Sequence, residues 1–300
     1  MDLAVVIVTR DRRASVLGTL PRLLALPERP RVLLVDNAST DGTAAAVRDA
    51  HPEVDVVALA DNLGCAGRTV GVRAAGTALV AFSDDDSWWA PGALAAAASR
   101  FAAAPEVAVV AGRILVGLDE RLDPVCVAMR DSPLGDVDGV GPQVLGFVAC
   151  GAVVRSAAYL AAGGFERRYV IGGEERLLAL DLAERGWVCG YAEDVVAHHH
   201  PAASRDPAAR RAAAVRNDLW TSWLRRPATV ALGDTGRAAV QARRDRATRR
   251  GLRAAVGGLG WVLPRRRPVG PATEAAVRLL ERGQTGSRTT TGISRSVLRV

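Results

Sequence analysis

The 300-residue sequence contains no lysine, so all 39 of its basic residues are arginines. We attribute this, together with the abundance of alanine and glycine, to the coding bias of a GC-rich genome, and we derive no mechanism from it. Aromatic residues are also scarce, at 4% of the chain. Hydrophobic residues nevertheless make up 49% of the sequence. This is enough for a core, in one large domain or in one domain with an appendage.

Cysteine is rare as well, and the positions of the cysteines argue against two kinds of cysteine-dependent structure. Cys65, Cys126, Cys150 and Cys189 are scattered along the chain and include no CxxC pair. The spacing therefore indicates neither a zinc site nor a disulfide framework. We expect reduced thiols in a cytoplasmic protein.

The two common phosphate-binding loop motifs are absent. GxGxxG would have to follow the first predicted strand, where the chain has Thr9-Arg10-Asp11-Arg12, and the segment 64–67 after the third strand lacks the pattern. GxxxxGK requires a lysine, which this sequence does not contain. These absences argue against classical NAD binding and ATP hydrolysis.

Long apolar runs are also missing. No run reaches the roughly 18 residues that a membrane span needs. The first apolar run is short, follows Asp2 and precedes the first arginines, which is not the order found in a secretory signal peptide. We expect a soluble cytoplasmic protein that is at most peripheral at the inner face of the cell membrane.

The net charge of +7 is unevenly distributed. Residues 1–200 carry 18 arginines against 26 acidic residues, whereas residues 201–300 carry 21 arginines against 6. This asymmetry predicts a helical basic extension over residues 205–283. The polar Ser/Thr/Gly-rich segment 284–300 is expected to be disordered. No nucleic-acid-binding motif accompanies the charge, so we expect no nucleic-acid partner.

The basic extension interleaves its arginines with tryptophan and leucine. Arginine clusters at 243–253 and 265–267 flank the apolar segment 257–263, a pattern that fits docking on anionic lipid headgroups. A solvated face or a contact between subunits is the alternative, which the sequence leaves open. An apolar stripe in the first helix of the extension is expected to pack on the core: Leu219, Trp220, Trp223 and Leu224.

The first 90 residues alternate between β-branched runs and segments with helical apolar spacing. This alternation predicts a doubly wound α/β fold with a mainly parallel sheet. The expected strands cover residues 3–8, 31–35, 54–59 and 78–82, and the expected helices cover residues 15–26 and 43–50 and a third segment ending near residue 75.

Each of these four strands ends in polar or small residues. The carboxyl ends of parallel strands meet at one edge of the sheet, where ligands bind in open α/β folds. The sequence therefore predicts a polar crevice lined by the four strand ends: Thr9-Arg10, Asp36-Asn37, residues 62–64 and residues 84–86.

Three adjacent carboxylates, Asp84, Asp85 and Asp86, directly follow the fourth predicted strand. Adjacent acids repel one another, and a cation, most often a metal ion, is the usual reason for a fold to hold them together. A solvated acidic turn that caps the next helix is the alternative. The triplet by itself does not decide between the two, and the polar ends of the other strands favour a metal.

The second half of the predicted core is less regular. We expect strands at 107–116, 146–155 and 186–191, helices at 91–104, 157–162 and 174–185, and a loop-rich segment at 119–142. Glu174 and Glu175 stand at a helix start, where a helix dipole favours acids, so a capping role remains open. The run 198–200 consists of three histidines, which indicates either a metal ligand or a solvated turn before Pro201.

Taken in order, these segments resemble the family 2 glycosyltransferases of the GT-A fold. The resemblance covers about residues 3–204 and implies a GT-A domain over 1–204, with a nucleotide-binding half at 1–90 and an acceptor half at 91–204. The matching segments are VVIVTRDR (5–12), VDNASTDGT (35–43), NLGCAGRTVGVRAA (62–75), AFSDDDSWW (81–89), GAVVRSAAYLAAGGFERRY (151–169), GGEERLLALDLAERGW (172–187) and the closing HHHP.

The resemblance implies transfer of a sugar, with inversion, from a UDP-, dTDP- or GDP-linked donor. The acceptor would be a hydroxyl of a glycan or a lipid-linked molecule of the cell envelope or of secondary metabolism. The implied cofactor is a divalent metal, Mn²⁺ or Mg²⁺, which would stabilise the charge of the nucleoside diphosphate leaving group.

The resemblance also implies roles for residues. The donor would be bound by Thr9, Arg10, Asp36, Asn62, Gly64, Arg68, Asp84 and Asp85, and the metal by Asp86 and His198. Glu175, beside Glu174, would be the general base. The family more often has Asp where Glu175 stands. The alternative reading is therefore a catalytically inactive nucleotide-sugar-binding partner protein.

Overall fold

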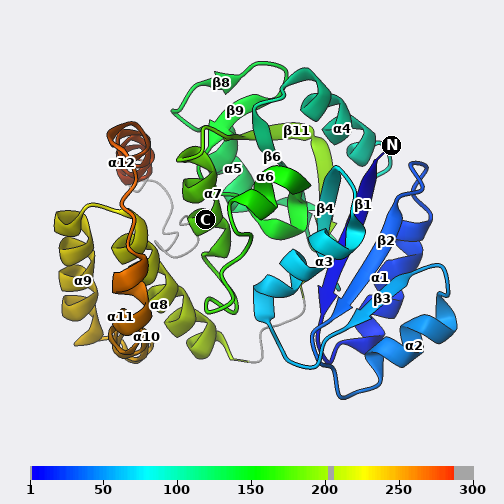
Figure 1. Ribbon diagram of the computed structural model, residues 1–300, viewed down its shortest axis with the longest axis horizontal. Helices are drawn as coiled ribbons and strands as arrows, with labels where there is room; N and C mark the ends of the chain where they lie inside the picture. Colours follow the sequence, from blue (N-terminus) through cyan, green and yellow to red (C-terminus); the bar gives the residue numbers. More distant parts are fainter. Residues whose placement is uncertain (1, 202–205, 287–300) are drawn as a thin grey trace.

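The computed structural model describes residues 2–201 and 206–286, with side chains up to Gly283. Its centre is an α/β sheet in the order β3-β2-β1-β4-β10-β6-β11-β9-β8 (Figure 1). The first four strands in the chain are β1 (Leu3–Thr9), β2 (Arg31–Asp36), β3 (Asp55–Ala58) and β4 (Leu79–Asp84). They pair in parallel. The predicted α/β fold with a parallel first half is confirmed.

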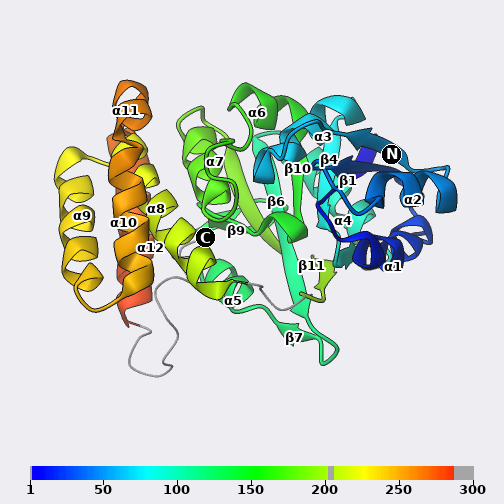
Figure 2. The same cartoon turned by 90° about the horizontal axis from the view of Figure 1, so that it is seen from below.

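The helices that connect these strands cover both faces of the sheet. One face of β1 packs with α1 (Arg13–Leu24), α2 (Thr43–Ala50) and α4 (Ala93–Ala103). The other face packs with α3 (Gly67–Ala75), α6 (Ser156–Ala161) and α7 (Glu174–Ala183). Figure 2 shows the sheet between these two layers. Because both faces are covered, the strands consist of uninterrupted apolar runs, as expected for a buried parallel sheet.

The second half of the sheet is mixed. It contains β6 (Val107–Val116), β10 (Ala152–Arg155), β11 (Val188–His199) and the short strands β8 (Asp136–Val137) and β9 (Gly141–Val144). Strand β10 is antiparallel to both β4 and β6, whereas β11 is parallel to β6. Strand β7 (Arg121–Leu122) pairs with β6, and β5 (Ser87–Trp89) pairs with β11.

Four expectations for this half were wrong in detail. Only the end of the predicted strand 146–155 is extended, because η2 (Ala149–Gly151) forms a 3₁₀ turn before β10. The predicted strand 186–191 continues through a register shift between Ala192 and Val196 and becomes the single strand β11. Helix α5 (Pro124–Arg130) lies inside the segment expected to be loop-rich, where Asp123 accepts a hydrogen bond from the backbone N–H of Val125. The strand β5 was not expected.

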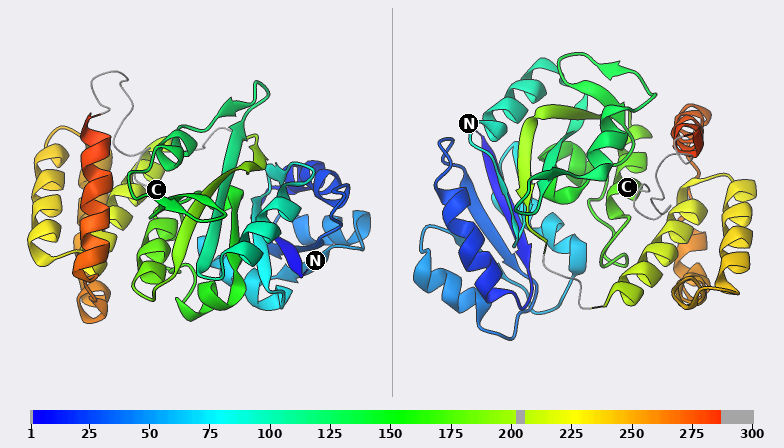
Figure 3. Two further views of the ribbon diagram at one scale, coloured as in Figure 1. Left: turned by 90° about the horizontal axis from the view of Figure 1, so that it is seen from above. Right: turned by 180° about the vertical axis from the view of Figure 1, so that it is seen from behind.

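Residues 207–286 form helices α8 (Pro207–Arg225), α9 (Ala228–Ala242), α10 (Arg246–Gly257), α11 (Leu259–Val262) and α12 (Pro271–Gly286), with the 3₁₀ turn η3 (Leu263–Arg265). These helices, yellow to red in Figure 3, lie beside the sheet in both views. The apolar stripe of α8 packs on the core as predicted, with Leu219, Trp220 and Leu224 buried. The predicted disordered tail lies outside the described residues from 287 onward, and 284–286 continue α12.

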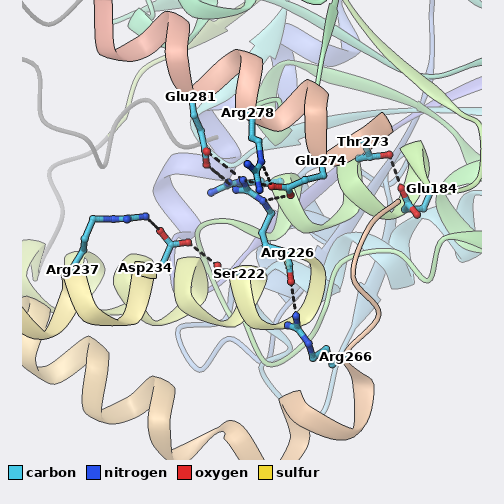
Figure 4. A network of polar contacts seen from close by, with 11 residues as sticks. Glu184, Ser222, Arg226, Asp234, Arg237, Arg266, Thr273, Glu274, Arg278 and Glu281 are labelled. Atoms are coloured by element: carbon cyan, nitrogen blue, oxygen red, sulfur yellow. Dashed lines mark hydrogen bonds and ion pairs between the residues drawn. The ribbon is translucent and has the colours of Figure 1, made fainter. Parts of the chain in front are cut away.

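A buried arginine attaches the last helix to α8. Arg226, 1% exposed, donates to both carboxylate oxygens of Glu274 and of Glu281 on α12, at 2.7–3.2 Å (Figure 4). Its own carbonyl accepts a hydrogen bond from Arg266. None of the described helices combines the length and the hydropathy needed to cross a membrane.

Candidate active site

The candidate site begins at the carboxyl ends of the first parallel strands. Thr9 and Asp36 are paired in register across β1 and β2, and Asp84 ends β4 beside Val8. The predicted meeting of these strand ends is therefore present. Asp36 is buried, and its Oδ1 accepts hydrogen bonds from the backbone N–H and the hydroxyl of Ser39. These bonds orient the carboxylate within the turn that follows β2.

The middle aspartate of the triplet points into the protein. Asp85 accepts a hydrogen bond from the Thr9 hydroxyl at 2.8 Å and one from Arg12 Nε at 3.2 Å. Its carbonyl oxygen accepts hydrogen bonds from Ser15 and Thr19. Burial raises the pKa of this carboxyl, while the Thr9 hydroxyl and Arg12 act against the shift. Asp85 thus ties the acidic turn to β1 and α1.

Arg12 also contacts the last aspartate of the triplet. Its Nη2 lies 2.9 Å from Asp86 Oδ2, and Nε2 of His199 lies 3.4 Å from Asp86 Oδ1. One guanidinium therefore offsets the repulsion between two neighbouring carboxylates, which explains how the turn forms. The sequence analysis did not select Arg12, although it stands in the segment 5–12 that carries the family resemblance.

Asp84 faces a different set of groups. Its Oδ1 forms an ion pair with Arg68 on α3, and it lies in a cluster with Cys150 and His199. One ligand atom from each of Asp84, Cys150 and His199 lies within 4.8 Å of the other two. These residues come from β4, η2 and β11, so the cluster forms only when the central strands pair.

Arg68 joins the acidic turn to the glutamate pair. Burial works against its charge, but Asp84, Glu174 and Glu175 outweigh it and raise the pKa of the guanidinium. Its Nε is buried and has no hydrogen-bond partner among the described residues. An arginine that is ionised, held between carboxylates and left with an unpaired donor is suited to bind an anionic group such as a phosphate.

Glu174 and Glu175 begin α7 directly after Gly173, whose φ of 87° is in the left-handed region. Glu174 is 3% exposed, and its Oε2 has no hydrogen-bond partner among the described residues. Burial raises the pKa of both glutamates. The charge of Glu174 raises the pKa of Glu175 further, to about 8. This environment differs from that of a solvated helix-capping acid and is typical of a proton-transfer site.

Three predicted site residues do not join this group. Arg10 is exposed and pairs with Asp11. Asn62 is exposed, and its side chain accepts a hydrogen bond from the backbone N–H of Gly64, which stabilises the loop after β3. His198 faces away from the acids, since its Nδ1 lies 3.1 Å from Glu120 and its ring stacks on Trp88 at 5.3 Å.

The loop that contains Gly64 is held tightly in place. The carbonyl of Val170 accepts a hydrogen bond from Cys65 N, and a Cβ at Gly64 would lie 2.3 Å from that carbonyl oxygen. Gly64 therefore has a packing role, because only glycine allows this approach at its φ of 56°. The same contact connects the loop after β3 to the segment that leads into Glu174.

The cluster of Asp84, Cys150, His199 and the adjacent Asp86 fits a divalent cation in the chemistry of its donors. Carboxylate oxygens suit Mn²⁺ and Mg²⁺, imidazole suits transition metals, and the ligand-atom spacing is small enough for one ion. His199 and Cys150 were not among the predicted ligands. The alternation of side chains along a strand separates His199 from His198, but the sequence does not show which side faces the acids.

Comparisons with known proteins agree with this fold. The model of "Glycosyl transferase family 2" matches residues 4–159. The chain is similar to N-acetylglucosaminyl-diphospho-decaprenol L-rhamnosyltransferase of Mycobacterium tuberculosis, with 30% identity over 271 residues. The alignment covers 75% of this chain and 87% of the relative.

Two solved structures share the fold. A mannosyltransferase from Pyrobaculum calidifontis in complex with GDP-Man and Mn²⁺ has a TM-score of 0.59 and 21% identity, over 99% of this chain and 85% of the other. TarS 1–349 of S. aureus in complex with UDP-GlcNAc has a TM-score of 0.57 and 15% identity, over 74% and 66%. The family match over more than half of the chain, with the rhamnosyltransferase relative, shows that this glycosyltransferase belongs to glycosyl transferase family 2.

Proposed function

We propose that the protein is a metal-dependent, inverting glycosyltransferase that moves a sugar from a nucleoside-diphosphate donor to an acceptor hydroxyl. The observation that carries this proposal is the position of Arg68, between the aspartate turn and the glutamate pair. The guanidinium of Arg68 is a positive charge whose Nε has no hydrogen-bond partner among the described residues. It interacts with Asp84 of the metal-type cluster and with Glu175, the candidate base. The structural relatives in complex with GDP-Man and Mn²⁺ or with UDP-GlcNAc support this donor class.

The donor end of the site is assigned as follows. Asp36 and Thr9, at the ends of β2 and β1, would contact the nucleoside, and Arg68 would contact the diphosphate. Asp84, Asp86 and His199 would hold the metal, with His199 in place of the His198 that the family resemblance implies. When bound, the metal supplies Lewis-acid stabilisation of the leaving diphosphate. Asp85 and Arg12 act as positioning residues, because their hydrogen bonds set the geometry of the turn.

The acceptor end contains the base. Glu175 would accept the proton of the attacking hydroxyl, on the face of the sugar opposite the leaving diphosphate. General-base help from a positioned carboxylate contributes about 10²–10⁴-fold. Its raised pKa makes it a stronger base than an exposed glutamate once it is ionised. The relatives that carry a function in their names are glycosyltransferases, which favours an active enzyme over the alternative of an inactive binding protein.

For the acceptor we propose a lipid-linked glycan of the cell envelope. The supporting observation is the relative's name, which places its rhamnosyl transfer on N-acetylglucosaminyl-diphospho-decaprenol. A lipid-linked acceptor would bring the enzyme to the inner face of the cell membrane.

The metal assignment is tested by turnover and by metal binding together. Nucleotide release is measured from UDP-, dTDP- and GDP-sugars with Mn²⁺ or Mg²⁺, with and without lipid extract. Asp86→Ala is expected to lower turnover by about two decades or more, because metal stabilisation of the leaving group contributes several kcal/mol. It should also weaken Mn²⁺ binding measured by electron paramagnetic resonance. The exposed Asp49→Ala on α2 is the control. Unchanged turnover in Asp86→Ala would refute the assignment.

The basic extension provides a surface for the membrane. Acidic residues of the extension form hydrogen bonds and ion pairs within the extension itself. Asp245 caps α10 and pairs with Arg211, and Asp234 binds Ser222 and Arg237. Exposed arginines gather in the segment from α10 to η3 and just before it: Arg243, Arg244, Arg246, Arg249, Arg250, Arg253, Arg265 and Arg267. The helical spacing of 246, 250 and 253 places three of them on one face of α10, with Val256 and Leu263 exposed nearby. We propose that this surface docks on anionic headgroups.

Vesicle sedimentation tests the docking. The protein is expected to bind phosphatidylglycerol vesicles and not phosphatidylcholine vesicles, with binding that weakens as salt increases. Arg250→Gln/Arg253→Gln should weaken binding by about 2 kcal/mol, or 30-fold, at about 1 kcal/mol per arginine. The control, Arg48→Gln/Arg73→Gln, removes the same charge from α2 and α3. Equal losses in both double variants would show an effect of net charge and would contradict a specific docking surface.

A further inference from the structure

The cluster at the centre of the site contains a group that the glycosyl-transfer assignment does not use. Cys150 lies in η2 and is 2% exposed, and its sulfur belongs to the three-residue cluster with Asp84 and His199. The other three cysteines are also buried, but none of them belongs to a metal-type cluster in the described part of the chain. The position of Cys150, rather than its residue type, makes it a candidate ligand.

The surrounding structure holds Cys150 firmly in place. The next residue, Gly151, packs closely against Ile114. A Cβ added at Gly151 would lie 2.5 Å from Cγ1 of Ile114. The backbone N–H of Gly151 donates to the carbonyl of Val148, which closes the 3₁₀ turn. The turn is therefore packed against β6 and leads directly into β10, between β4 and β6. The backbone of this turn therefore cannot move Cys150 away from the cluster without disturbing the central sheet.

The ligand atoms of Asp84, Cys150 and His199 include a sulfur and an imidazole nitrogen, whereas a site for a hard cation such as Mg²⁺ normally offers only oxygen atoms. Mn²⁺ and Mg²⁺ prefer oxygen ligands, whereas thiolate is soft and selects Zn²⁺, Cd²⁺ or Co²⁺ over them. Three protein ligands that include sulfur and imidazole, with further positions for solvent or substrate, are typical of zinc sites with an open coordination position. Asp84 is already paired with Arg68 through Oδ1, but a carboxylate has two oxygens and can contact both cations.

We propose that Asp84, Cys150 and His199 form a binding site for a thiophilic divalent cation of the Zn²⁺ class, and that such a cation inhibits the enzyme by occupying the place of Mn²⁺ or Mg²⁺. The binding part of this proposal stands on the cluster alone. The inhibition part rests on the proposed function. Cys150 thereby makes the catalytic centre sensitive to zinc-class metals, which a serine at this position would not do.

An optical titration tests the binding directly. Metal-free, reduced full-length protein is titrated with Cd²⁺, and the thiolate-to-cadmium charge-transfer absorption in the ultraviolet is recorded. The wild type is expected to show a band that saturates at one equivalent. Cys150→Ser should lose the band, and its affinity should fall by at least about tenfold, the minimum cost expected even for loss of an outer-shell partner. Cys189→Ser replaces another buried cysteine and should retain the band.

Asp84→Asn and His199→Gln retain the thiol and provide a second test if Cys150→Ser does not fold, as judged by thermal unfolding. Each should weaken Cd²⁺ binding by about tenfold or more. Absence of the band in the wild type, its persistence in Cys150→Ser, or unchanged affinity in both other variants would overturn the site.

Inhibition is measured separately on the active enzyme. Zn²⁺ is expected to reduce Mn²⁺-dependent turnover of the wild type, with recovery on adding a chelator. Cys150→Ser should need at least about tenfold more Zn²⁺ for the same loss. Equal sensitivity of the two proteins would overturn the inhibition. If no donor sugar is turned over at all, the proposed function fails, while the optical titration still decides whether the cation site exists.

Discussion

Glu174 and Glu175 are residues whose roles depend on their surroundings. An acid in the first turn of a helix is ordinarily solvated and stabilises the helix dipole. Here Glu174 is buried with an oxygen that has no hydrogen-bond partner among the described residues. Burial raises the pKa of both glutamates, and the charge of Glu174 raises the pKa of Glu175 further. Arg68 lowers the pKa of both but does not cancel the effect of burial. The pair is therefore poised to take up a proton near neutral pH.

The pKa of Glu175 predicts the pH dependence of activity. A general base must be ionised, so kcat/KM is expected to fall as the pH drops below about 8, the raised pKa of this carboxyl. Glu174→Gln removes the adjacent negative charge, lowers the pKa of Glu175 and should shift this acidic limb to lower pH. Glu175→Gln should retain donor binding and lose about two decades or more of kcat. Near-normal turnover in Glu175→Gln, or an unmoved limb in Glu174→Gln, would place the base elsewhere. The exposed Glu106→Gln serves as control.

The same shift has a consequence for stability. A glutamate with a raised pKa binds its proton more tightly in the folded state, so stability falls as the pH rises from the unfolded pKa toward the folded one. Glu175→Gln removes this loss. We therefore expect its melting temperature to exceed that of the wild type at pH 8 and to approach the wild-type value at pH 4. Higher stability combined with lower turnover in Glu175→Gln is expected when a functional side chain is held in an environment that is unfavourable for its charge.

At the scale of elements, the pairing of β5 with β11 decides which histidine faces the acids. Trp88 is paired with His198 in register, stacks on its ring and contacts His200 edge-on at 4.7 Å. His199 therefore points to the opposite side, toward Asp86. The alternation of side chains along an extended chain was predictable from the sequence. The side that meets the acids was not, because β5 is a three-residue strand with no sequence signal of its own.

The packing of α10 on α8 depends on a glycine. A Cβ at Gly251 would lie 2.5 Å from the carbonyl oxygen of Ala212, a backbone atom that cannot move away cheaply. Gly251→Ala is therefore expected to destabilise the protein by about 1–3 kcal/mol, the usual cost of overpacking. Gly236→Ala in α9 is the matched control, since no atom lies within 4 Å of its added Cβ. It should be neutral or stabilising by up to about 1 kcal/mol.

Tryptophan fluorescence during chemical denaturation measures both variants, because Trp220, Trp223 and Trp261 all lie in the helices of this part. Equal effects of the two alanines would contradict a specific role for close helix packing at Gly251.

At the scale of the whole molecule, the helical extension supports the active site directly. Asn217 on α8 is fully buried, and its Nδ2 donates to the carbonyls of Tyr169, Ile171 and Gly172. These carbonyls belong to the segment immediately before Glu174. The hydroxyl of Tyr169 is hydrogen-bonded to Thr221 of the same helix at 2.8 Å. We infer that α8 sets the backbone from which Glu174 and Glu175 project, in addition to the membrane docking proposed for the extension.

The attachment of α12 should be a large contributor to stability. Arg226→Met leaves the buried Glu274 with Arg278 as its remaining ionic partner, and removing one partner of a buried ion pair costs about 3–5 kcal/mol. Glu281 is half exposed, so its part of the loss is screened by water. We therefore expect about 3 kcal/mol in chemical denaturation. Arg237→Met, which breaks the exposed pair with Asp234 shown in the same close-up, should cost at most about 1 kcal/mol (Figure 4). Similar costs for both would contradict the importance of burial.

The local pattern of the sequence determined most of the first half of the fold. The apolar runs and helical spacing predicted β1, β2, β4 and α2 to within about two residues. A strand buried on both faces is a continuous apolar run, and a helix buried on one face repeats its apolar residues every three to four positions. The polar strand ends also predicted that Thr9, Asp36 and Asp84 would meet, since parallel strands share a carboxyl edge. The antiparallel pairing of β10 was not visible in its short, apolar sequence.

Only the tertiary structure decided which side chains act together. Arg12 reaches Asp85 and Asp86 across 73 and 74 residues, and Cys150 meets Asp84 and His199 from three separate elements. In the folded protein the ring of His198 stacks on Trp88. Asn217 of the extension donates a hydrogen bond to the carbonyl of Gly172, in the segment before Glu174. Residue type and spacing carry information about neighbours along the chain. The contacts that build this site depend instead on strand register and helix docking, which are settled only when distant segments pack.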